Sequence, residues 1–64
     1  MSEVETLNNL LKGELSAIES YSEALRKLDG GYVAEVLNQC HSSHIERAEK
    51  LRSAIAGSGG TPTE

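Results

Sequence analysis

The stretch Lys27-Leu28-Asp29-Gly30-Gly31-Tyr32 decides the fold of this 64-residue chain, because it separates two segments with the same apolar periodicity. Consecutive glycines end a helix, and Gly30 suits the left-handed conformation that commonly follows a helix C-terminus. On both sides of the break, apolar residues recur in steps of three and four, as in the helices of a bundle. We therefore predict an all-α fold, an antiparallel hairpin of two helices joined by a tight turn.

The predicted helices each carry one apolar stripe. The stripe before the turn consists of Val4, Leu7, Leu11, Glu14, Ile18, Tyr21, Leu25 and Leu28. The stripe after it consists of Val33, Leu37, Cys40, His44, Ala48, Leu51 and Ile55. Ser2 followed by Glu5 is a capping-box pattern, so we expect helices over about residues 3–28 and 32–56 within a hairpin at 1–57. Residues 58–64 are rich in glycine and lack periodicity, which predicts a flexible tail or linker.

The hairpin is too small to bury its own apolar stripes. A core of this size supplies only a few kcal/mol, and small natural domains add disulfides, a metal or a partner chain. A single cysteine, Cys40, excludes an internal disulfide. We expect one side of the hairpin to expose Leu7, Leu11, Ile18, Leu25, Leu37, Leu51 and Ile55. The expected assembly is a homodimer, in which two hairpins form a four-helix bundle.

Composition also limits the partners. The net charge of −4 repels phosphate and the six basic residues do not cluster, so we expect neither nucleic acid nor an anionic membrane as a partner. No apolar run reaches the roughly 18 residues of a membrane span. The N-terminus lacks the pattern of a signal peptide, and a lone thiol suits a reducing compartment, so a cytoplasmic location is expected.

Two polar residues interrupt the apolar stripes. Glu14 lies in the first stripe and His44 in the second. Folding the chain about Gly30 brings residue 14 to the level of residue 46, within one helical turn of His44. His41 precedes His44 by three residues and lies on the same side of its helix. Glu14, His41 and His44 are therefore the candidate metal ligands.

Other readings of these residues stay open. Glu14 and His44 also fit a buried ion pair that fixes the register of the helices, and His41 also fits a boundary residue that faces water. Tyr21 is read as a packing residue or as a hydrogen-bond donor near a metal. Cys40 is read as a small buried hydrophobe or as a soft ligand. The chain contains no nucleophile–base pattern and no glycine-rich phosphate loop.

The chain resembles the first helical hairpin of a ferritin-like four-helix-bundle family of unknown function. The resemblance is carried by Leu7-Asn8-Asn9-Leu10-Leu11-Lys12-Gly13-Glu14 with Ala17-Ile18 and Tyr21, then by Val36-Leu37, Cys40, Ser43-His44 and Leu51-Arg52. Gly59-Gly60-Thr61-Pro62 is similar to the linker that leads in that family to a second hairpin. The chain thus corresponds to half of the family's domain, as a half-length form or as part of a longer protein.

The resemblance implies a di-iron site with one Glu from the first helix and Glu-x-x-His from the second, repeated in the other hairpin. Glu14 matches the first Glu and His44 matches the histidine. His41 stands where the family has its second carboxylate. Two hairpins would therefore supply two carboxylates and four imidazoles, a set that suits zinc, copper or another divalent ion as well as iron.

Two functions of different classes follow from the sequence. The first is a ferritin-like metal-binding protein, with iron oxidation or storage as the activity that the resemblance implies, and whether it is an enzyme stays open. The second is a non-catalytic helical oligomerisation module, in which Glu14 and His44 form only a polar layer. The metal content of the purified protein would separate them.

Overall fold

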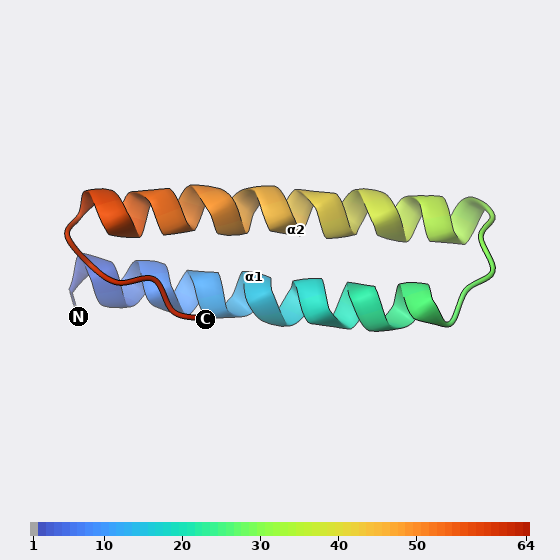
Figure 1. Cartoon of the computed structure of the whole chain (residues 1–64), viewed down its shortest axis with the longest axis horizontal. Helices are drawn as coiled ribbons and strands as arrows, with labels where there is room; N and C mark the ends of the chain where they lie inside the picture. Colours follow the sequence, from blue (N-terminus) through green and yellow to red (C-terminus); the bar gives the residue numbers. More distant parts are fainter. Residues whose placement is uncertain (1) are drawn as a thin grey trace.

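The computed structural model describes residues 2–64 and confirms the all-α helical hairpin. Helix α1 spans Glu3–Arg26 and helix α2 spans Tyr32–Gly57. The two helices lie side by side and antiparallel along their whole length (Figure 1), in a body of 42 × 14 × 14 Å. Among residues 2–64, no helix combines the length and apolarity needed to cross a membrane.

The ends of the helices follow from local hydrogen bonds. Ser2 caps α1, since its Oγ accepts a 3.1 Å hydrogen bond from the backbone N–H of Glu5. Helix α1 ends at Arg26, two residues before the predicted end. The N–H of Leu28 already donates to the carbonyl of Leu25 in a tighter turn (3.2 Å). The chain then reverses through Gly30 and Gly31, with φ of 98° and 90°, a conformation that favours glycine.

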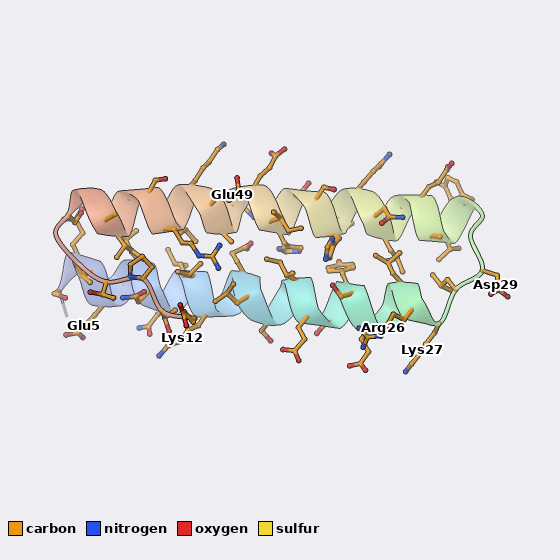
Figure 2. The ribbon with its side chains drawn as sticks, in the orientation of Figure 1. Glu5, Lys12, Arg26, Lys27, Asp29 and Glu49 are labelled. Atoms are coloured by element: carbon orange, nitrogen blue, oxygen red, sulfur yellow. The ribbon has the colours of Figure 1, made fainter. Side chains whose placement is uncertain are left out.

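Four apolar side chains are buried between the helices. They are Leu11, Ala34, Ala48 and Ile55. Residues 4, 11, 18 and 25 of α1, and 34, 41, 48 and 55 of α2, repeat every seven positions and form the line along which the helices touch. The small side chains of Ala34 and Ala48 let α2 approach α1 closely. Labelled charged residues such as Glu5, Lys12 and Glu49 point away from the other helix (Figure 2).

The expected exposed apolar side is wrong in its residues, since the structure leaves none of the seven fully exposed. Leu11 and Ile55 were predicted to be exposed, but both are fully buried within one hairpin. The large apolar residues that are exposed are instead Leu10, Leu28, Tyr32, Val33 and Val36. The apolar stripe of each helix consists of two columns, and within each column residues repeat every seven positions. Each helix is oriented so that one column faces the neighbouring helix and the other column lies to the side.

Residues 58–64, here called the tail, contain no helix or strand but turn back along α1 (Figure 1). Gly59 has φ of 81°, and the N–H of Gly60 donates to the carbonyl of Ile55 (2.9 Å), which is a Schellman turn at the end of α2. Asn8 then holds the tail. Its Nδ2 donates to the carbonyl of Thr61 (3.1 Å), and its Oδ1 accepts from the N–H of Thr63 (2.8 Å).

Candidate functional site

Glu14 and His44 meet between the helices, near the middle of each, as the hairpin geometry predicts. Nδ1 of His44 lies 2.9 Å from Oε2 of Glu14 and 3.3 Å from Oε1. The side chains are largely buried, with exposed fractions of 21 % for His44 and 17 % for Glu14. A carboxylate so far removed from water needs hydrogen-bond donors, and the imidazole is one of them.

Arg47 is the second donor to Glu14, and the sequence reasoning missed it. Its Nε lies 3.1 Å from Oε2 and 3.2 Å from Oε1. Its position three residues after His44 was the signal, because it lies one turn along α2 on the same side as the histidine. The Arg47 side chain is 52 % exposed, so one part contacts Glu14 while the rest reaches solvent.

In the Glu14–His44–Arg47 cluster, Nδ1 of His44 lies within hydrogen-bond distance of both other side chains. A terminal nitrogen of Arg47 lies 2.8 Å from Nδ1 of His44, the atom that also faces Glu14. A protonated Nδ1 donates to Glu14, whereas an unprotonated Nδ1 accepts from Arg47, so the two hydrogen bonds exclude one another. The first arrangement leaves Nε2 of the neutral imidazole as an acceptor on the far side of the ring.

The cluster keeps Glu14 ionised. The side-chain hydrogen bond with His44 is the largest influence and holds the pKa of Glu14 below its ordinary value of 4.5. Partial burial acts in the opposite direction and raises this pKa. The hydrogen bond and the positive charge of Arg47 add to the lowering. The carboxylate is therefore a permanent anion at neutral pH.

Tyr21 and Cys40 flank the cluster. The Tyr21 ring stacks on the His44 ring with centroids 5.4 Å apart and an interplanar angle of 28°. A side-chain hydrogen bond with Cys40 raises the pKa of Tyr21 above its ordinary value of 10.0, and burial adds to the rise. Tyr21 is thus both a packing residue and a hydrogen-bonded one, and its ring lies against that of His44.

His41 does not join Glu14 and His44. Its Nε2 lies 2.8 Å from Oγ of Ser22, so it is paired on another part of the interface. Positions three apart on a helix differ by about 60° in direction, so His41 lies on the line where the helices touch and contacts Ser22, whereas His44 lies to the other side of it and contacts Glu14. Within residues 2–64 no group of three His, Cys, Asp or Glu side chains could hold a metal ion. The predicted ligand set is not assembled in one chain.

A shallow groove lies beside the cluster. It has a volume of about 290 Å³ and is lined by Leu10, Glu14, Arg47, Lys50 and Leu51. Leu10 is 56 % exposed at its edge. The groove combines apolar walls with opposite charges, which suits contact with another protein surface.

Comparisons with family models, with curated proteins and with solved structures find no match to this chain. Its function is therefore inferred from its own residues.

Proposed function

We propose that this chain is a helical oligomerisation module, in which two hairpins pair into a four-helix bundle and the Glu14–His44–Arg47 cluster forms a polar layer between them. The supporting observation is the unequal burial of the hairpin. Among residues 2–64 four side chains are buried, whereas Leu10, Leu28, Val33 and Val36 are exposed on either side of the largely buried Glu14–His44 pair.

Pairing would cover the apolar side chains that one hairpin leaves in water. Exposed apolar side chains that lie along one side of a helix pair are suited to contact with another protein surface. Two hairpins are the simplest closed assembly, because a twofold interface uses the same surface on both copies. A polar layer inside such a bundle serves register and partner choice more than stability.

Sedimentation equilibrium over a range of protein concentrations tests the pairing. We expect a single dimeric species at micromolar concentration. Leu10→Glu places a charge on the exposed apolar surface and should shift the protein toward the monomer. Ser16→Glu adds the same charge six residues after Leu10, about 120° around α1 from it and at an exposed position, where it should change little. A folded wild-type monomer at these concentrations would contradict the proposal.

A second candidate function is ferritin-like metal binding between two copies. The observation that favours it is the 2.9 Å contact between a carboxylate and an imidazole of facing helices. The residues of one chain do not fit a metal ion, because the carboxylate of Glu14 is paired with Arg47 and His41 contacts Ser22. An ion would therefore need Glu14 and His44 from both copies, and Arg47 would have to leave the carboxylate.

Thermal melts separate the two candidates. A metal-binding dimer gains stability with iron(II) or zinc and loses it with a chelator. Its Glu14→Ala variant loses that response, and its His44→Ala variant retains little of it. The same melting midpoint under all conditions supports the oligomerisation module alone.

A further inference from the structure

The two long sides of the hairpin differ. Asn8 and Ser22 lie a multiple of seven residues apart and so share one side of α1. The tail packs there on Asn8, and His41 contacts Ser22 there; we call this the tail face. Residues 7, 14, 21 and 28 repeat by seven along the other side of the contact line. We call that side, with Val36, Cys40, Arg47 and Leu51 of α2, the open face.

The tail face is already covered over part of its length, and the open face is not. Gly60 packs so closely on α1 that an added Cβ would lie 2.6 Å from a methyl group of Val4. The groove, the polar cluster and the exposed Leu10 and Val36 all lie on the open face. A partner hairpin can therefore reach the open face without displacing any part of this chain.

The polar cluster lies at the middle of the open face. Glu14 and His44 are each within one residue of the midpoint of their helices. Apolar side chains lie toward both ends, with Leu10 and Leu51 on one side of the cluster and Val36 on the other. If a twofold axis passes through this midpoint and is perpendicular to the helices, the two copies overlap along their whole length.

Charge distinguishes this arrangement from a parallel one. In a parallel pair every residue meets its own mate at the same level, so Lys50 would face Lys50. In the antiparallel pair the two Lys50 residues lie about 16 Å apart along the bundle, beyond the Debye length of physiological salt. At the axis, the half-exposed Arg47 of one copy can face the ionised Glu14 of the other.

We propose that a second copy of this chain docks on the open face in antiparallel orientation, with the twofold axis at the level of Glu14, His44 and Arg47. The inference rests on the self-association proposed above and specifies which surface is used and how the copies are oriented. The Glu14–His44–Arg47 clusters of the two copies then form one layer of six side chains, which neither copy contains alone.

Single-cysteine cross-linking tests the orientation in a Cys40→Ser background. Ser43→Cys lies on the open face about two residues from the midpoint of α2, so its mate is within reach. Val36→Cys lies on the same face, but about 25 Å from its mate along the bundle. Lys12→Cys lies one turn after Asn8, near the middle of the tail-face side. We expect Ser43→Cys to form a covalent dimer on the order of 100-fold faster than the other two, because only its thiols share a high effective concentration.

Each other outcome overturns a defined part of the inference. Equal cross-linking at Ser43→Cys and Val36→Cys would show a parallel pair, and fastest cross-linking at Lys12→Cys would show that the tail face is used. In both cases the parent still sediments as a dimer, so self-association stands and the assigned face or orientation is wrong. A parent that sediments as a monomer overturns both.

Discussion

Glu14 has two hydrogen-bond donors on the opposite helix, and this explains how a carboxylate is tolerated in an apolar stripe. His44 alone would leave part of the charge unpaired, and Arg47 supplies the remaining hydrogen bonds from one turn further along α2. Arg47 keeps its own charge near water, so the cluster avoids the full desolvation of an ion pair. Glu14 therefore links α1 to α2 through hydrogen bonds with both His44 and Arg47.

The lowered pKa of Glu14 predicts acid sensitivity. A carboxyl group whose folded pKa lies below its unfolded value stabilises the fold fully above the unfolded pKa, and the effect is lost as the pH falls through the folded pKa. The melting midpoint of the wild type should therefore fall below about pH 4.5, and Glu14→Gln should reduce the slope of that fall. Melts at one protein concentration between pH 7 and pH 3 measure this. Equal slopes for both proteins would show that Glu14 is not linked to folding.

At the scale of elements, the periodicity of the sequence determines the helices but not their rotation. The 3–4 spacing predicts α1 and α2 to within two residues, and folding about Gly30 correctly pairs Glu14 with His44. Both apolar columns of a helix satisfy the same pattern, so the pattern does not say which column faces the neighbour. In the structure the small Ala34 and Ala48 are buried on the contact line, and His41 contacts Ser22 in that arrangement.

The return of the tail was not predicted, because its energy comes from contacts distant in sequence. A glycine-rich end without periodicity is typical of a linker, and only the Schellman turn at Gly59 redirects the chain toward α1. Asn8 then supplies a donor and an acceptor to a segment more than fifty residues away. No local pattern in the sequence identifies such a pair.

Gly60→Ala tests the packing of the tail. The new Cβ would lie 2.6 and 2.9 Å from the two methyl groups of Val4, a β-branched residue with little rotamer freedom. The tail should therefore detach, and the amide of Thr63 should lose protection in hydrogen exchange. Gly57→Ala is the matched control, since its Cβ meets nothing within 4 Å and alanine favours the helix. Unchanged protection of Thr63 in Gly60→Ala would show that the tail is held otherwise.

At the scale of the whole molecule, the hairpin is a slender body 42 Å long and 14 Å across, with little interior. Its tail covers part of one long side, and its exposed apolar side chains lie on the other. Such a molecule gains most by adding a second layer of helices, because a helix pair can cover only one column of each apolar stripe. The polar cluster lies on that surface, and in the proposed dimer it would distinguish one docking register from the others.

Replacing the whole cluster should therefore separate stability from specificity. Glu14→Leu alone leaves His44 and Arg47 facing one another without their anion, so the melting midpoint should fall. The triple change Glu14→Leu, His44→Leu and Arg47→Leu removes every charge together and should restore or raise the midpoint, as in other buried ionic groups replaced by apolar ones. The same triple variant should lose its single stoichiometry, because an all-apolar surface accepts several registers and several partners. Light scattering after size-exclusion chromatography should then show a mixture of sizes where the wild type gives one. A triple variant that stays a uniform dimer would show that apolar shape alone sets the assembly and that the cluster has another role.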